Sequence, residues 1–377
     1  MGPLPHDTAR RSARGANFSP FQAPFPLCSP YGGTAQSLRV PQRGGAPPLD
    51  VLLGFDDPMS YCSGGATGQH PYFGALIGRV ANRIANCSFS LGGATFTTPC
   101  NEFQAATGLN DTLHGGTFGY DRRVWTVAQR SPASVTLTLY SPDGEMGFPS
   151  ALQLTVVHTL RDDGALPGSH GVWDLSWAIK NVGTEPTPVA PTMHAYFMLS
   201  GFKGEDTVLG HVLQMANATR YEAVDAGLIP TGELVDVTRA QRWMDFTAPK
   251  ALGRDFPLPS GASGYDNAWV FSSAARAFLP QADLFAPASG VRMVTYTDAP
   301  SVQVYTGNFL NATGPTQIVK KRAQRFPGQG AFYPQHSAIT FEAQEYIGAA
   351  NIPAFPSITL APGQTYTQHT AYELASK

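Results

Sequence analysis

Charged residues are scarce in this chain: Asp, Glu, Lys and Arg make up 14% of its 377 residues, and the formal net charge is -2. No Lys/Arg run or basic patch stands out, which argues against nucleic acid as a partner. Long hydrophobic runs are missing too, because no stretch approaches the roughly eighteen apolar residues of a membrane-spanning helix. We therefore expect neither a nucleic-acid nor a membrane partner.

Cysteine is also rare, and its spacing does not suggest a metal site. There is no CxxC pair among the four cysteines, which are Cys28, Cys62, Cys87 and Cys100. Cys87 and Cys100 flank a predicted hairpin, CSFSLGGATFTTPC, that turns at a Gly-Gly pair. With Leu91 opposite Ala94, Cys87 faces Thr98, so a disulfide to Cys100 needs a bulge or a shifted register. We expect free, buried thiols.

The N-terminal region lacks the apolar segment of a signal peptide, although it carries Arg10, Arg11 and Arg14. Residues 1–30 are Pro-rich and polar, which predicts a loosely ordered arm. On this basis we expect a cytoplasmic protein. A secreted glycoprotein stays open as the alternative because of five N-x-S/T triplets, which begin at Asn17, Asn86, Asn110, Asn217 and Asn311.

Turn and strand residues are abundant: the chain has 39 Gly, 32 Pro and 11% aromatics. Short runs of β-branched and aromatic residues recur between Gly, Pro, Asp or Asn, as in 133–141, 151–160, 172–182, 290–298 and 301–310. Only 238–246 and 250–255 suggest short helical turns. The pattern predicts an all-β fold, a large antiparallel β-sandwich that forms one domain over residues 31–377.

One predicted strand, within HSAITFEAQEYIGAANIPAFP (336–356), carries an acid at its centre. Apolar Ile339, Phe341 and Ala343 alternate with polar Thr340, Glu342 and Gln344. Period-2 geometry sends the two sets to opposite faces. A carboxylate and an amide on one face of an otherwise apolar strand indicate a binding site.

Two further segments combine polar residues with tight backbone signals. YFGALIGRVANRIAN (72–86) contains Arg79 and Arg83, which taken alone favour a structural salt bridge over a ligand contact. In NDTLHGGTFGYDRRVW (110–125), His114 precedes two glycines that let the backbone turn sharply and let a ligand approach. The simpler interpretation of His114 is a turn cap.

Two more segments place polar groups among apolar ones. In PTMHAYFMLSG (191–201), His194 and Tyr196 share the face opposite Phe197, and the scarcity of nearby charge favours a cleft over open surface. In GYDNAWVF (264–271), Asp266 stands among aromatic residues, a combination that suits sugar hydroxyls and C–H faces but also occurs in ordinary cores.

In their order and local sequence these segments resemble the aldose 1-epimerase (galactose mutarotase) family. The likeness rests on GRVANRIAN, NDTLHGG with GYDRRVW, SPDGEMGFP, PTMHAYFMLSG, YDN, VYTGNF, and FEAQ followed by FPSITLAPGQTY. It covers nearly the whole chain, from about residue 31 to 374. The resemblance implies a galactose mutarotase-like supersandwich, a small-molecule aldose substrate, and no metal or other cofactor. We expect a monomer or weak homodimer.

By position, the resemblance implies an acid–base pair. Glu342 would remove the proton from the anomeric O1 hydroxyl and His194 would protonate the ring oxygen, so that the pyranose opens and recloses on the other carbonyl face. Reference pKa values of about 4.3 and 6.5 suit a carboxylate base and an imidazole acid. The implied substrate-binding residues are Arg79, His114 and Asp266, with Tyr196, Gln303, Gln344 and Tyr305 as further candidates.

The chain departs from the family pattern after the E-x-Q motif. Where the family usually has Pro-Asp-Ala-hydrophobic-Asn, this chain has IGAAN (347–351), and Met198 stands where Asn is common. These differences suggest altered loop packing or substrate preference.

Two other functions stay open. A non-catalytic carbohydrate-binding β-sandwich would not need both Glu342 and His194. A hexose-6-phosphate 1-epimerase would need a cationic pocket, to which the chain could contribute Arg122, Arg123, Lys320, Lys321 and Arg322.

Overall fold

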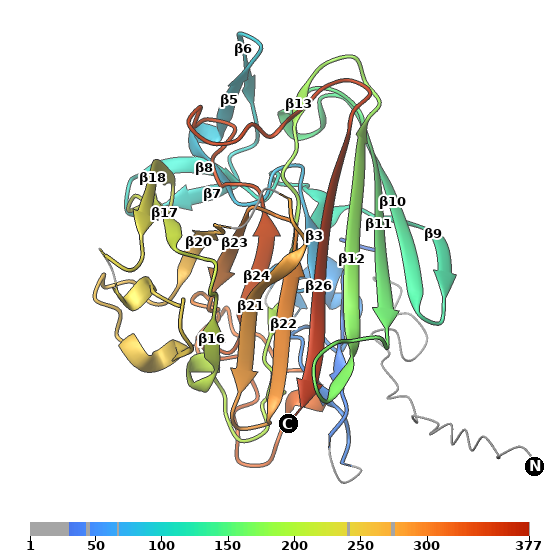
Figure 1. The fold of residues 1–377 in the computed structure, drawn as a ribbon. Helices are drawn as coiled ribbons and strands as arrows, with labels where there is room; N and C mark the ends of the chain where they lie inside the picture. Colours follow the sequence, from blue (N-terminus) through green and yellow to red (C-terminus); the bar gives the residue numbers. More distant parts are fainter. Residues whose placement is uncertain (1–29, 43–45, 66–67, 240–241, 273–275, 377) are drawn as a thin grey trace, which may run out of the picture.

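The computed structural model describes residues 30–376 apart from 43–45, 66–67, 240–241 and 273–275, and it consists mainly of antiparallel strands (Figure 1). One layer is a nine-stranded sheet. In spatial order its strands are β19 (Lys250–Ala251), β16 (Val212–Gln214), β21 (Leu279–Ala286), β22 (Val291–Thr297), β26 (Thr365–Ser376), β12 (Ser169–Asn181), β11 (Leu152–Arg161), β10 (Ser134–Ser141) and β9 (Thr126–Ser131).

A second layer is a six-stranded sheet, which lies beside the first in Figure 1. Its order is β15 (Tyr196–Phe197), β24 (Ile339–Gln344), β23 (Ser301–Tyr305), β20 (Asp266–Val270), β17 (Arg220–Val224) and β18 (Pro230–Asp236). The two layers share one core: the rings of Phe197 and Tyr372 are 5.0 Å apart, and the Gln368 side chain donates to the Ala343 carbonyl at 2.9 Å.

Short strand pairs complete the fold. They are β1 (Arg39–Val40) with β2 (Leu49–Asp50), β3 (Ala75–Ile77) with β14 (Thr192–His194), β5 (Ser88–Leu91) with β6 (Ala94–Thr97), β13 (Thr187–Pro188) with β25 (Thr359–Leu360), and the trio β4 (Arg83–Ile84), β8 (Leu109–Leu113) and β7 (Glu102–Gln104). The described helical pieces are α1 (Ser60–Ser63) and the 3-10 turns η3 (Ala85–Cys87), η4 (Tyr120–Arg122), η5 (Glu145–Gly147), η6 (Val208–Gly210), η7 (Arg242–Met244), η8 (Leu252–Asp255) and η9 (Arg322–Gln324). No helix of the described residues is long and apolar enough to cross a bilayer.

The all-β prediction is confirmed. Each predicted strand segment contains an observed strand, and the two predicted helical turns contain η7 and η8. The reason is the same alternation that the sequence shows: β11, for example, buries every second side chain from Leu152 to Leu160. The arm over residues 1–30 falls almost wholly outside the described residues, so its division from a domain over 31–377 stays a prediction.

The expectation of free thiols at Cys87 and Cys100 is wrong, because the two residues form a disulfide with Cα atoms 5.3 Å apart. The predicted hairpin register is nevertheless present, with Leu91 opposite Ala94. Asn86 and Cys87 both adopt left-handed backbone conformations, with φ of 53° and 51°, and the regular strand begins only at Ser88. Cys87 therefore lies outside the ladder that the register argument assumed.

Replacing both cysteines by serine (C87S/C100S) should lower the free energy of unfolding by about 3 kcal/mol, because the bridge closes a short loop in the unfolded chain. The measurement is urea denaturation with and without dithiothreitol. The reductant should shift the wild-type curve onto that of C87S/C100S and leave the variant unchanged. A wild-type curve that ignores the reductant would contradict the assignment.

Candidate active site

The candidate site lies on the face of the six-stranded sheet that points away from the nine-stranded one. On β24, Ile339 and Phe341 pack into the shared core while Glu342 points to the opposite side. Glu342 pairs across the ladder with Gln303 on β23, and directly opposed residues of antiparallel strands point to the same side. The alternation seen in the sequence therefore separates a core face from a cavity face, and both faces are buried.

A cavity of about 200 Å³ opens over this face. Most of the expected site residues line it, namely His114, His194, Tyr196, Asp266, Gln303, Tyr305 and Glu342. They come from segments more than 200 residues apart in the sequence, so the fold rather than local sequence brings them together. Strands β14, β4 and β8 bring the histidines and Arg83 to the cavity from outside the sheet.

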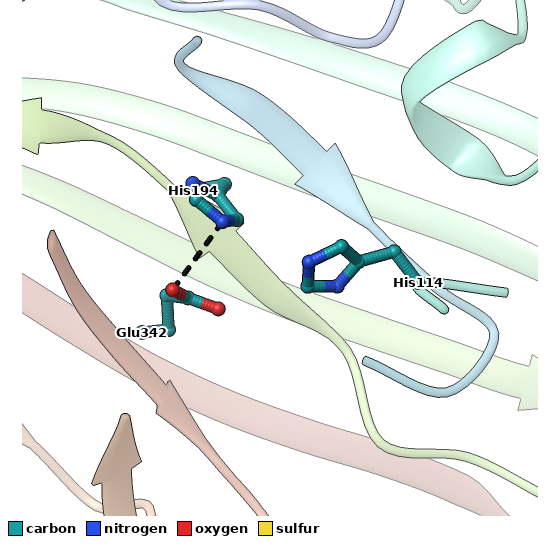
Figure 2. A group of neighbouring side chains, drawn as sticks. All are labelled: His114, His194 and Glu342. Atoms are coloured by element: carbon teal, nitrogen blue, oxygen red, sulfur yellow. Dashed lines mark ion pairs between the residues drawn. The ribbon is translucent and has the colours of Figure 1, made fainter. Parts of the chain in front are cut away.

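His194 and Glu342 form the central pair. The Nε2 atom of His194 lies 3.4 Å from Oε1 of Glu342, and the Thr340 hydroxyl donates to the same oxygen at 2.9 Å. Figure 2 shows the imidazole on β14 directed at the carboxyl on β24, with His114 beside them. The His194 ring stacks on Tyr196 with 4.9 Å between ring centroids, which fixes its plane.

Burial moves the two pKa values in opposite directions. It raises the pKa of the Glu342 carboxyl to about 8 and lowers the pKa of the His194 imidazole to about 3. Between those two pKa values the pair holds one proton, which resides on Glu342 and leaves His194 neutral. That differs from the ionised base and separate acid that reference pKa values suggested.

His114 occupies an unusual backbone position. Its φ is 54°, and a side chain on the next residue, Gly115, would come within 2.0 Å of the Gly78 carbonyl oxygen, so only glycine fits there. The Nδ1 atom of His114 accepts the Asn82 N–H at 3.1 Å. The neutral ring therefore carries its proton on Nε2, where it can donate a hydrogen bond.

The ring and carboxyl atoms of His114, His194 and Glu342 lie within 4.8 Å of one another, a spacing that a metal ion could use. His114 does not fit that role as it stands. Its Nδ1 is engaged by the backbone and its Nε2 carries the proton, so neither nitrogen offers a free lone pair. The cluster suits hydrogen bonding to a polar organic ligand better than metal coordination.

Asp266 and Gln303 form a second polar group on the cavity face. The Gln303 amide nitrogen donates to Oδ1 of Asp266 at 2.6 Å, and burial raises the pKa of Asp266. Within the described residues, Oε1 of Gln303 and Oε2 of Glu342 are buried without a hydrogen-bond partner. Buried polar atoms are nearly always paired, so these oxygens indicate a hydroxyl-bearing ligand or water.

Arg79, expected to bind substrate, lies elsewhere. The residue is 2% exposed, and its guanidinium donates to the Ser141 hydroxyl and to the carbonyls of Pro149 and Ser150 at 2.8–2.9 Å. Arg83 lines the cavity instead, paired with Glu102 at 2.8 Å. The reason is local: Asn82 is left-handed, with φ of 59°, which turns the chain between the two arginines.

Gln344, the second expected residue outside the cavity lining, is 1% exposed near the end of β24. It does share the face of Glu342, as the alternation predicted, but lies beyond the cavity. Tyr72 and Asn82 are cavity residues that the sequence did not reveal. Both residues have a positive φ, which is uncommon outside glycine and is visible only in the structure.

Comparison with known proteins identifies the family. A family model described as Aldose 1-epimerase matches residues 27–373. This chain belongs to the aldose 1-epimerase family. It is 35% identical to the galactose mutarotase of Bos taurus over 92% of this chain and 89% of that protein, and 30% identical to the aldose 1-epimerase of Escherichia coli (strain K12) over 92% and 91%.

A solved structure supports the same fold. The crystal structure of a GalM/aldose epimerase homologue from C. elegans superimposes with a TM-score of 0.74 at 27% sequence identity, covering 92% of this chain and 94% of that one. Met198, which the sequence analysis singled out as unusual, does not line the cavity. Its side chain is fully buried in the core.

The two arginines should respond differently to replacement by methionine. Arg79→Met should lower the free energy of unfolding by about 3 kcal/mol or more, because several buried carbonyls lose their donor. Arg83→Met should lower it less, because its partner Glu102 is partly exposed, but should raise KM for an aldose about tenfold through loss of a charged donor at the cavity. Urea denaturation and steady-state kinetics test both. A stable Arg79→Met that has lost sugar binding would place Arg79 in the site.

Proposed function

We propose that Glu342 and His194 carry out the proton transfers by which this aldose 1-epimerase interconverts the α and β anomers of free aldoses such as glucose and galactose. The observation that carries the proposal is the buried pair itself, 3.4 Å apart at a cavity that offers further hydrogen-bonding groups. Ring opening needs one group that takes the O1 proton and another that gives a proton to the ring oxygen.

A single shared proton suits both half-reactions. Opening starts with ionised Glu342 and protonated His194, and it ends with neutral Glu342 and neutral His194. Closure runs in reverse: the carboxyl returns a proton to O1 and the imidazole takes one from the C5 hydroxyl. The pair thus holds one proton before and after each step, and rotation about C1–C2 between the steps inverts the anomer.

The remaining cavity groups suit sugar binding. His114 can donate from Nε2, Gln303 and Asp266 can accept from hydroxyls, and Arg83 can donate to a ring or hydroxyl oxygen. Tyr196 and Tyr305 supply apolar ring surface for the C–H faces. We propose these residues as the substrate-binding set, with Arg83 in place of Arg79.

The alternative of a phosphorylated substrate finds little support. Among the described residues that line the cavity, Arg83 is the only Lys or Arg, and Glu102 neutralises it. Lys320 and Lys321 are buried against Asp206 and Asp50, away from the cavity. A dianionic phosphate would need unpaired cationic donors. A purely binding module, in turn, does not explain a matched proton donor and acceptor.

Compartment and oligomeric state stay predictions. The Cys87–Cys100 disulfide favours an oxidising, secretory environment, and the exposed side chains of Asn86 and Asn110, which begin two of the N-x-S/T triplets, are compatible with it. We propose that the substrate is a small free aldose whichever compartment holds the protein, and that the protein is a monomer or weak homodimer.

Replacing either member of the pair should abolish most of the activity. Glu342→Gln and His194→Asn should each lower kcat about 10²- to 10⁴-fold, the usual contribution of general acid–base catalysis. The assay is polarimetry or NMR anomer exchange on fresh α-D-glucose and α-D-galactose, with the buffer rate subtracted. Matched controls are Glu373→Gln and His158→Asn, which alter a buried carboxyl and a buried imidazole on the nine-stranded sheet.

The controls should keep kcat within about threefold of wild type, because neither group touches the cavity. Wild-type protein that does not exceed the buffer rate on either sugar would refute the proposed function. Full activity in both site variants would refute the assignment of residues.

The rate should depend on pH through the shared proton. Because burial raises the pKa of Glu342 to about 8, the pair keeps its proton below that pH and loses it above. Without it nothing protonates the ring oxygen, so kcat/KM should fall about tenfold per pH unit above pH 8. Buffer-corrected polarimetry from pH 6 to 10 tests this. A rate that keeps rising with pH would indicate a lone carboxylate base instead.

A further inference from the structure

A second buried carboxyl, that of Glu222, binds a backbone N–H and does not line the cavity as Glu342 does. Glu222 lies on β17, is fully buried, and accepts the backbone N–H of Ile347 with both oxygens, at 3.1 and 3.3 Å. Burial raises its pKa to about 8. Ile347 belongs to the segment that follows the catalytic strand, where the chain departs from its family pattern.

The register of the sheet places Glu222 on the cavity face. Its neighbour Tyr221 pairs with Trp269, whose side chain is in the core, so Glu222 points the other way, as Glu342 does. The chain after β24 must therefore cross the sheet on the cavity side to bring Ile347 to Glu222. We call this crossing segment, residues 345–352, the bridging loop.

The bridging loop touches different structures on its two sides. On one side it meets the β17–β18 hairpin: a Cβ at Gly348 would lie 3.6 Å from Pro230, and the Glu222 carboxyl holds Ile347. On the other side Ala349 and Ala350 pack against the apolar cluster that contains Ile84, the residue next to Arg83. Asn351 also donates to the Ser88 carbonyl at 2.9 Å.

We propose that Glu222 is a positioning residue of the active site, which anchors the bridging loop through the Ile347 N–H and so fixes the Arg83 wall of the cavity relative to Glu342. The inference rests on the proposed function, because it concerns the same cavity. It assigns Glu222 no proton transfer, since the carboxyl is not part of the cavity lining.

The physical basis is that two buried polar groups, the Ile347 N–H and the Glu222 carboxyl, are each other's hydrogen-bond partner. An unpaired buried N–H and an unpaired buried carboxyl are each costly, and together they satisfy one another in a hydrogen bond. Removing one partner leaves the other unsatisfied, so the loop is expected to shift. Removing both, by an apolar side chain at 222 and a proline at 347, leaves neither group to satisfy, because proline has no N–H.

Four variants test the proposal: Glu222→Leu, Ile347→Pro, the double variant, and Glu222→Gln, which keeps an acceptor oxygen. Each single change that breaks the bond should raise KM about tenfold with kcat within about twofold, a coupling typical of one buried hydrogen bond. The double variant and Glu222→Gln should both return KM to within about threefold of wild type. Glu233→Leu, the same type of change at an exposed site on the same hairpin, is the matched control.

A second readout does not depend on activity. Hydrogen exchange at the Ile347 amide should be slow in wild type and in Glu222→Gln, and at least about tenfold faster in Glu222→Leu. Inactive wild-type protein with a protected Ile347 amide would refute the proposed function but leave the anchor intact. An unchanged KM in Glu222→Leu, or a double variant no better than the single ones, would overturn the proposal.

Discussion

The structure depends on one strand, β24, being buried on both faces while carrying a carboxyl group. Its apolar side chains join the two sheets, and its polar ones face a cavity instead of solvent. Water on the polar face would have left Glu342 an ordinary surface acid with an unremarkable pKa. Glu342 and His194 are buried beneath the short strands and loops of this face, and that burial shifts their pKa values.

Low dielectric also determines how the pair behaves. An ionised carboxylate and a protonated imidazole are each disfavoured by burial, so the empty site prefers the neutral form of both, with one proton between them. A sugar whose O1 and ring oxygen contact the pair offers polar partners for both charge states. In the proposed mechanism these contacts offset the cost of ionising the pair while the sugar is bound, and the same two groups carry out the reverse step.

The sequence predicts those features that depend on local periodicity. Alternation alone places Glu342 opposite the core face of β24, and it places His194 and Tyr196 on one face near β14. Prediction from alternation fails where the backbone does not have regular strand geometry. Arg79 and Arg83 stand in one motif, and only the left-handed turn at Asn82 sends them to different surroundings. The same kind of irregularity at Asn86 and Cys87 creates a disulfide that a regular hairpin register excludes.

Glu222 marks a further limit, because no local pattern distinguishes it from a surface acid. Its proposed role follows only from its contact with the backbone N–H of Ile347, which lies 125 residues further along the sequence. A buried N–H at Ile347 needs an acceptor, and the Glu222 carboxyl supplies one. Glu222 and Ile347 therefore each satisfy a buried polar group of the other, and neither group would be satisfied alone. The proposed contact thus belongs to the support of the cavity wall, not to the groups that transfer protons in the proposed mechanism.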